Sequence, residues 1–333
     1  MRRLIRRLGL YLLAVWAAIT VNFFLPRLAP GDPVAALQQR LQQRGSFNPA
    51  SLDALRAEFG LNTNDPLWLQ YLKYLNNLIH GNLGVSITRF PASVGDVIGQ
   101  DIKWTLVLLS VSVLLSFSLG TLVGIFMAWN RGTAFDTALS SLMMFFYSIL
   151  YPWLAIVAVY FLGFNLGWFP FAFGYDTSLT PGWSAEFIAS AAYHAILPAL
   201  TLIVSTIAGW MLTMRNSMVT TLSEDYVLLA RAKGLSSRRV MFAYAARNAI
   251  LPSVTGFAIA LGTVVGGQLL VEIVFSYPGI GFDLFQAIQG QDYALADGIL
   301  LLVIVATVFM NLIVDLLYTI LDPRVREGRS VSA

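Results

Sequence analysis

The chain has 333 residues, of which 57% are apolar and only 12% are charged, and its mean hydropathy is +0.70. A typical soluble domain has about 25% charged residues, so the composition indicates a membrane protein with several spans. The lack of cysteine excludes disulfides, thiolate metal sites and cysteine nucleophiles. The two histidines lie far apart in the sequence, which argues against a metal site. The net charge of +3 does not indicate a nucleic-acid partner, because the basic residues follow membrane topology.

Six segments have the run of about 20 mostly apolar residues that a membrane helix needs. They are residues 8–25, 104–130, a helix within 137–175 that should stop near Gly163, 187–214, 248–271 and 294–321. The sequence therefore predicts an all-α polytopic membrane protein with six transmembrane helices. A cleaved signal peptide is the alternative for the first segment, but its apolar run exceeds the usual length of about 7–15 residues.

The distribution of Lys and Arg predicts that both termini are cytoplasmic. With that orientation the cytoplasmic side receives the basic N-terminus, Arg131, Arg215, a basic loop and the C-terminal arginines. The short outer loops near 164–186 and 272–293 contain no Lys or Arg. Seven basic residues fall on the outer side, all in or beside the long segment 27–103, and long loops count weakly in this rule.

We divide the chain into four parts on this basis. They are the first membrane helix (1–28), an extracytoplasmic segment (29–100), a core with five membrane helices (101–322) and a cytoplasmic tail (323–333). In the extracytoplasmic segment, apolar residues at helical spacing predict short helices over 51–59 and 66–80.

One polar stretch of the core, the loop 219–249, is patterned as helix. Ser223 is a candidate N-cap, and the acidic residues that follow it suit the first turn of a helix. One face repeats at helical spacing and consists of Tyr226, Leu229, Ala230 and Lys233. Gly234 is expected to end this helix. A second helix should start at Ser236 or Ser237 and continue into the fifth span.

The residues alone leave two interpretations of this loop open. Its arginines need no partner, because basic residues gather beside the cytoplasmic ends of membrane helices. The small residues Ala230, Ala232 and Gly234 at the corner would, however, allow another protein to approach closely. An ordinary loop and a docking surface are therefore both consistent with the pattern.

The loop resembles the coupling loop of ABC-importer permeases, in which a helix with small residues is followed by a glycine and then by I-x-L-P or a close variant. The matching motifs are YV (226–227), ARAKGLS (230–236) and RNAILP (247–252). Further matches in chain order are LAPGDP (28–33), GNLGVS (81–86), VEIVFSYPGIG (271–281), NLIVDLLY (311–318) and LDPR (321–324). Together they resemble the B-type permease subunit of the dipeptide/oligopeptide/nickel family. The glutamate of the archetypal E-A-A motif is absent, and Leu228 stands near its place.

The resemblance implies the ABC type I importer (MetI-like) permease fold, in a bacterial or archaeal plasma (inner) membrane. Besides membrane lipid, the implied partners are a second permease subunit, two ATP-binding subunits and an extracytoplasmic substrate-binding protein. The chain has no G-x-x-x-x-G-K-[ST] phosphate loop. We therefore expect no cofactor on this chain and no enzymatic activity, with ATP and Mg bound by the partner ATPases. The residues implied to dock an ATPase are Tyr226, Ala230, Arg231, Ala232, Lys233, Gly234, Leu235 and Ser236.

A second set of residues is assigned to helix packing or to the translocation pathway: Gly262, Gly266, Glu272 and Asp315. The two glycines form a small-xxx-small pair, as do Gly120 and Gly124, and close helix packing is the favoured interpretation of both pairs. For Asp315 a structural role is favoured over contact with substrate.

Other polar, proline and aromatic residues have structural interpretations too. Glu272 and Asp297 are expected near the outer surface, where solvation explains them about as well as a functional role does. Pro152 and Pro198 are expected to form static kinks, and His194 to be a hydrogen-bonded structural residue. The aromatic outer stretch 168–175 predicts interfacial anchoring, with contact to a binding protein or to sugar rings as the alternative.

Two other classes of function are less consistent with the sequence. A secondary transporter would need ionisable residues at mid-bilayer for ion coupling, and only Asp315 is close. An intramembrane enzyme would need converging acids, or a histidine with a nucleophile, and the six segments lack such a set. For an importer, the resemblance allows oligopeptides, nickel or oligosaccharides such as cello-oligosaccharides. The aromatic outer loops tilt our expectation slightly toward oligosaccharides.

Overall fold

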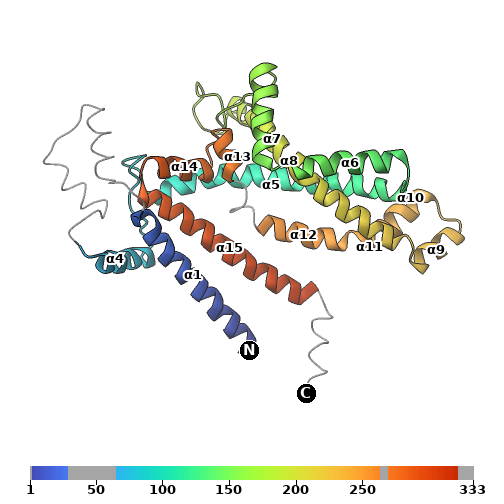
Figure 1. The fold of residues 1–333 in the computed structure, drawn as a ribbon, viewed down its shortest axis with the longest axis horizontal. Coiled ribbons are helices and arrows are strands. Elements are labelled where there is room, and N and C mark those ends of the chain that lie inside the picture. Colours follow the sequence, from blue (N-terminus) through green and yellow to red (C-terminus); the bar gives the residue numbers. More distant parts are fainter. Residues whose placement is uncertain (1, 29–64, 263–268, 322–333) are drawn as a thin grey trace. The chain divides into compact units, whose positions relative to one another are not determined.

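The structure is a computed structural model that describes residues 2–28, 65–262 and 269–321 (Figure 1). In this part of the chain every regular element is a helix, and the one strand-like pairing is a single bridge between Val85 and Ser93. The prediction of an all-α protein is confirmed. The helices pack as two units, which we call unit 1 (Met1–Thr105 and Pro278–Leu312) and unit 2 (Leu106–Tyr277 and Ile313–Ala333).

Within the described ranges, three helices are long and apolar enough to cross a membrane. They are α5 (Val94–Trp129), α8 (Ala185–Thr221) and α15 (Tyr293–Leu321). A fourth span is possible if a bent helix pair counts as one. Shorter apolar stretches lie in α1 (Arg2–Leu28) and α12 (Leu251–Gly262). The number of six membrane helices stays a prediction.

The third predicted span is not one helix. It consists of α6 (Ala134–Ser148), α7 (Tyr151–Ala158) and a π-helical turn, η1 (Val159–Asn165), with a bend of 95° at the break after α6. Leu150 is extended at this break, and Pro152 occupies the first turn of α7. Proline cannot donate the hydrogen bond that would continue α6, but it is well tolerated where a new helix begins. Pro152 therefore marks the start of a helix and not a kink within one.

Helix α8 is the central element of unit 2. It contacts α6, α7, α12 and α13 (Leu269–Val274), and Pro198 lies inside it. Gly120 and Gly124 of α5 also pack against it, because a Cβ atom on either glycine would come within 3 Å of α8 backbone or Cβ atoms. The prediction that this glycine pair serves close helix packing is confirmed. His194 of α8 hydrogen-bonds to the Ser190 carbonyl at 2.9 Å, as expected of a structural histidine.

In unit 1, α1 packs on α4 (Leu67–Ile79) through aromatic rings. Phe23 is fully buried and contacts the rings of Tyr71 and Tyr74, while the hydroxyls of Thr20 and Tyr71 lie 2.7 Å apart. The predicted helix over 66–80 is thus confirmed, whereas the one over 51–59 lies outside the described residues.

Unit 1 also contains a helix that we did not predict, α14 (Ile280–Gln289), within the expected outer loop 272–293. Its buried apolar side chains Ile280, Leu284 and Ala287 recur at i, i+4 and i+7, which is the spacing of a one-sided helix. A second departure is α5, which begins ten residues before the predicted start at Trp104. The additional turns bury Val94, Val97 and Ile98 on one face.

Candidate functional site

The polar loop of unit 2 folds as two helices joined by a glycine corner. The first is α9 (Asp225–Ala232), and the second runs through α10 (Ser237–Arg239), the π-helical turn η2 (Val240–Ala246) and α11 (Arg247–Ala249) toward α12. Both predicted helices are therefore present. The N-cap of α9 is Glu224 and not Ser223, whose hydroxyl donates instead to the Thr220 carbonyl at 2.7 Å. The acidic first turn that we expected is supplied by Asp225.

The buried face of α9 differs from the predicted one. Val227 and Ala230 are buried, whereas Tyr226, Leu229 and Lys233 are exposed. Only Ala230 of the predicted face therefore packs inward. The shift by one residue places Leu228 and Leu229 side by side in solvent-accessible positions, at 49% and 56% exposure.

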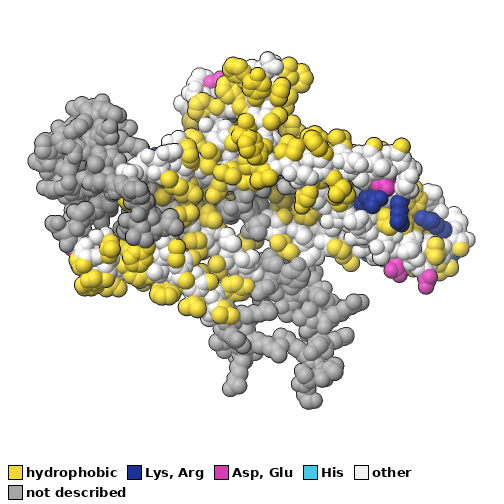
Figure 2. Space-filling view, in the orientation of Figure 1, with side chains coloured by type: hydrophobic (Ala, Val, Ile, Leu, Met, Phe, Trp, Pro, Cys, Tyr) yellow, Lys and Arg dark blue, Asp and Glu magenta, His cyan; other side chains and the backbone are white. Residues whose placement is uncertain are grey.

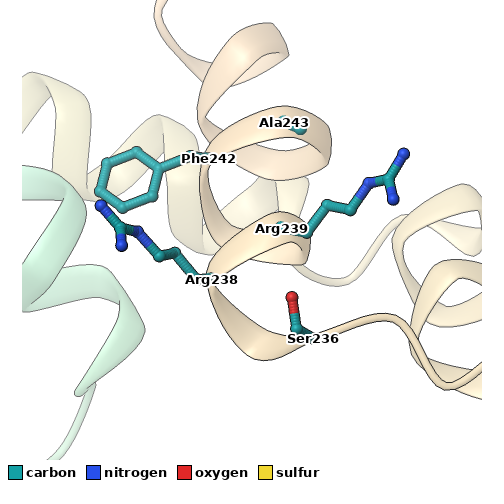
Figure 3. Close-up of a pocket in the computed structure, with 5 residues that line it drawn as sticks. All are labelled: Ser236, Arg238, Arg239, Phe242 and Ala243. Atoms are coloured by element: carbon teal, nitrogen blue, oxygen red, sulfur yellow. The ribbon is translucent and has the colours of Figure 1, made fainter.

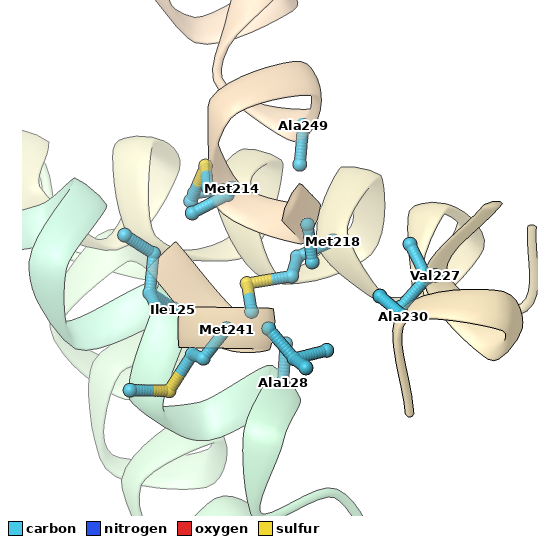
Figure 4. Close-up of a cluster of buried hydrophobic side chains, with 11 residues drawn as sticks. Ile125, Ala128, Met214, Met218, Val227, Ala230, Met241 and Ala249 are labelled. Carbon is cyan, nitrogen blue, oxygen red and sulfur yellow. The ribbon is translucent and has the colours of Figure 1, made fainter. Parts of the chain in front are cut away.

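A buried apolar cluster, here called the methionine cluster, holds the loop on the rest of unit 2 (Figure 4). Its members come from α5, α8, α9, η2 and α11 and are Ile125, Ala128, Met214, Met218, Val227, Ala230, Val240, Met241, Ala245, Ala246 and Ala249. Unbranched methionines fill gaps between helices well, and the alanines let backbones approach. The loop is thus packed on helices of its own unit and not held by its flanking chain alone.

The corner itself requires a glycine for its backbone. Gly234 has a φ of +73°, which residues with a Cβ rarely adopt, and its amide hydrogen-bonds to the Arg231 carbonyl at 2.9 Å. A Cβ atom at this position would meet nothing within 4 Å. The prediction that Gly234 ends the helix is confirmed, and the space beside it is open.

A hydrogen bond ties the two helices of the loop together. The amide of Asn248 donates to the Tyr226 hydroxyl at 2.8 Å, across 22 positions of sequence. The guanidinium of Arg231 lies 5.3 Å from the centre of the Trp129 ring, a distance at which a cation is attracted to an aromatic face. These contacts fix the loop with respect to the end of α5.

A second charged contact lies between α6 and α8. Arg215 donates from Nε and Nη2 to the two carboxylate oxygens of Asp136, at 2.6 and 2.7 Å. This paired geometry is a strong form of ion pair. Gly132 also donates its amide to Asp136, at 3.1 Å. Sequence reasoning had placed Arg215 by topology alone and had not found its partner.

The residues predicted to dock an ATPase are mostly accessible in the structure. Tyr226, Arg231, Ala232, Lys233, Gly234 and Ser236 are exposed, Leu235 is half-buried and Ala230 is buried. Figure 2 shows Lys and Arg side chains gathered over this end of unit 2, in contrast to the apolar surface of its long helices. Together these residues form a polar, accessible surface at this end of unit 2.

The second predicted set is only partly visible. Gly262 ends α12, Gly266 lies outside the described residues, and the side chain of Asp315 does too. Glu272 is fully buried in α13, and Asp297 in α15 is 4% exposed. Of the two interpretations of these acids, solvation is excluded, because packing of the surrounding helices keeps water from both.

Unit 1 contains a polar network that sequence reasoning missed, here called the acid staple. Arg89 pairs with Asp101 of α5 at 2.8 Å and with Asp283 of α14. Burial, together with the neighbouring Asp101 carboxyl, raises the pKa of Asp283 to about 8, although Arg89 acts in the opposite direction. One guanidinium thus serves two buried carboxyl groups.

The acid staple continues at Asp292, the buried residue before α15. Its carboxylate accepts from the Ser86 hydroxyl at 2.6 Å and from the amide and hydroxyl of Thr88 at 2.8 and 2.9 Å. It also accepts from the Leu295 amide at 3.1 Å. The segment after α4 is therefore anchored to α14 and α15. The GNLGVS motif ends at Ser86 and was a signal for this site, but its partner lies 206 positions away.

Comparison with known proteins agrees with this geometry. Residues 120–327 match the model of a family described as binding-protein-dependent transport system inner membrane component. The chain is 34% identical to the di/tripeptide transport system permease protein DppB of Pseudomonas aeruginosa, over 97% of this chain and 98% of that protein. It is 34% identical to the dipeptide transport system permease protein DppB of Escherichia coli (98% and 99% covered). It is 33% identical to the oligopeptide transport system permease protein AppB of Bacillus subtilis (92% and 93% covered).

Proposed function

Because this chain belongs to the family of binding-protein-dependent transport system inner membrane components, we propose that it forms half of the translocation pathway of an ATP-driven importer for peptides. As a multi-pass permease of the dipeptide/oligopeptide ABC-importer family, it resides in the plasma (inner) membrane. The remaining half of the pathway is a second permease subunit, and an extracytoplasmic binding protein delivers the substrate. The six-helix topology with both termini in the cytoplasm is part of this proposal.

The names of the relatives support peptides as the substrate class. Proteins that match this chain over nearly its whole length are named for transport of di- and tripeptides, dipeptides or oligopeptides. They favour peptides over the oligosaccharides toward which the aromatic outer loops had tilted our expectation. The exposed aromatic side chains of that region, among them Trp168 and Trp183, are then anchors at the membrane interface.

The glycine corner is the single observation that supports the coupling mechanism best. Gly234 is exposed and has open space beside it, while the methionine cluster holds the helices on either side. Movement of an ATPase docked at this corner would be transmitted to packed helices and not to a flexible segment. Nucleotide binding to the ATPases would thereby bias the permease between inward-open and outward-open states.

Reconstitution in proteoliposomes tests the proposal. We expect uptake of a radiolabelled di- or tripeptide that requires ATP, the second permease, the ATP-binding subunits and the binding protein together. Uptake driven by an ion gradient with no ATPase present would contradict the proposal and favour a secondary transporter.

A ligand screen on the partner binding protein tests the substrate class independently. Peptides should raise its melting temperature, and cello-oligosaccharides should not. Stabilisation by cello-oligosaccharides alone would restore the oligosaccharide alternative while leaving the ATP-driven mechanism intact.

A further inference from the structure

A hollow of about 480 Å³ lies beside the second helix of the coupling loop (Figure 3). It is lined by Ser236, Arg238, Arg239, Phe242 and Ala243. The helix that lines it continues through η2 and α11, and Phe242 packs against the methionine cluster. The hollow therefore rests on a packed part of unit 2 and is not the surface of a loose loop.

The two arginines of the hollow differ from two others of unit 2 that have a partner within it. Arg215 pairs with Asp136, and Arg231 lies over Trp129. Arg238 and Arg239 are both exposed, and neither has an ion pair with any residue that the structure describes. Their charge is thus available to a partner. Arginine binds carboxylates through two parallel hydrogen bonds and is enriched at protein interfaces.

The two guanidinium groups lie on different sides of the hollow. Figure 3 shows Arg238 extending beside the Phe242 ring, and Arg239 extending away from it on the opposite side, with Ser236 below. A single lipid headgroup would be bound by arginines whose guanidinium groups converge. Arginines that diverge are suited to two acceptors held apart on an extended surface.

The neighbouring helix α9 adds apolar contact area. Tyr226, Leu228 and Leu229 are exposed on it, although the segment is polar overall. Interfaces between proteins combine such apolar and aromatic side chains with arginine. This combination favours a protein partner over a lipid headgroup.

We propose that Arg238 and Arg239 dock an acidic surface segment of the ATP-binding subunit, each guanidinium pairing with one carboxylate while an intervening side chain of the partner occupies the hollow. The inference rests on the proposed function, because it assumes that an ATPase reaches this loop. It adds the chemistry of the contact: cationic on the permease and anionic on the ATPase. Such contacts set orientation and encounter rate, and they weaken with added salt.

The test uses this chain with its second permease subunit in nanodiscs made from zwitterionic lipid and, in a parallel set, from zwitterionic lipid with anionic lipid added. ATP-binding subunits that co-purify with the wild-type complex are identified and purified separately, and their affinity is measured by surface plasmon resonance at several salt concentrations. The double variant Arg238→Gln, Arg239→Gln should weaken binding by about tenfold or more and flatten the salt dependence. The variant Arg238→Lys, Arg239→Lys keeps the charge but not the two parallel hydrogen bonds, so it should restore the salt dependence and only part of the affinity.

Arg131→Gln is the matched control, because it removes one exposed positive charge of unit 2 that does not line the hollow. Its affinity should equal that of the wild type. Unchanged affinity and salt dependence in the double Gln variant would overturn the inference while leaving the proposed function intact. Failure of the wild type itself to bind any ATP-binding subunit would instead refute the proposed function. A loss that occurs only when anionic lipid is added would assign the arginines to the membrane and also overturn the inference.

Discussion

The methionine cluster of unit 2 and the acid staple of unit 1 fix chain segments by opposite means. The methionine cluster buries apolar side chains and leaves its cations outside, where Lys233, Arg238 and Arg239 are exposed. The acid staple buries its carboxyl groups, with Asp101, Asp283 and Asp292 all at most 5% exposed. Apolar burial is non-directional and uses none of the loop's charged groups, so those groups stay available to a partner. A buried ionic network depends on geometry and suits a segment that must keep one position.

The substitution Gly234→Trp should have the largest effect, and it acts on the loop that the methionine cluster holds. The bulky side chain fills the open space at the corner and also requires a strained positive φ, so transport should be abolished and ATPase association weakened. Membrane insertion should be normal. Peptide uptake and co-purification of the ATPases measure these effects.

Gly234→Asn is the matched control, because asparagine tolerates positive φ better than other residues with a Cβ. It should retain far more uptake than the Trp variant. Normal ATPase assembly and uptake in Gly234→Trp would refute docking at this corner.

Asp292→Ala should cause the largest loss of stability in the acid staple. It leaves the hydroxyl of Ser86, two groups of Thr88 and the Leu295 amide without their acceptor. Unpaired buried donors are costly, and we expect a loss of about 3 kcal/mol. Thermal unfolding in detergent measures it. Asp292→Asn keeps one acceptor oxygen and should lose less; equal melting temperatures for the Ala variant and the wild type would argue against the anchoring role.

Raising the pH toward 8 should weaken the acid staple and leave the methionine cluster unaffected. The folded-state pKa of Asp283, about 8, lies above its ordinary value of 3.8, so the folded protein binds this proton more tightly than the unfolded chain. The stability due to the proton is complete below pH 3.8 and is lost as the pH rises through about 8. The charged groups facing Asp283 are Arg89 and Asp101.

We expect the free energy of unfolding to fall by roughly 2 kcal/mol between pH 6 and pH 8. Melting curves at the two pH values measure this change. Asp283→Asn carries no titrating proton and should flatten the dependence; a wild-type curve that does not change with pH would contradict the assignment.

Tyr226→Phe should have the smallest effect. It removes the acceptor for the Asn248 amide, and both partners are exposed, so water can replace the bond. A loss of about 0.5 kcal/mol is expected, visible as faster amide exchange in α9. Phe keeps the ring, so the difference isolates the hydroxyl. Exchange rates equal to those of the wild type would show that apolar packing alone holds the loop.

Local features were predictable from the sequence, and contacts between distant segments were not. The two loop helices and the corner at Gly234 follow from helical spacing and a glycine, all within 30 residues, although the N-cap and the buried face of the first helix differ from the predicted ones. The spacing of Ile280, Leu284 and Ala287 was equally readable, and α14 was missed only because the region lies between two spans. The contact of Arg89 with Asp283 joins positions 194 apart. No local pattern contains that information, and the same holds for Arg215 with Asp136, 79 apart.

The π-helical turn η2 determines the direction, about the helix axis, in which Arg238 and Arg239 face. Each residue turns an α-helix by about 100°, and a π-helical turn accommodates an additional residue without breaking the helix. If the same residues between Val240 and Ala246 wound as regular α-helix, Arg238 and Arg239 would therefore swing by roughly 100° about the helix axis relative to α12. Composition and charge would not change, yet the arginines would face another direction. The direction in which this surface faces thus depends on the helix type of seven residues and not on the side chains that it presents.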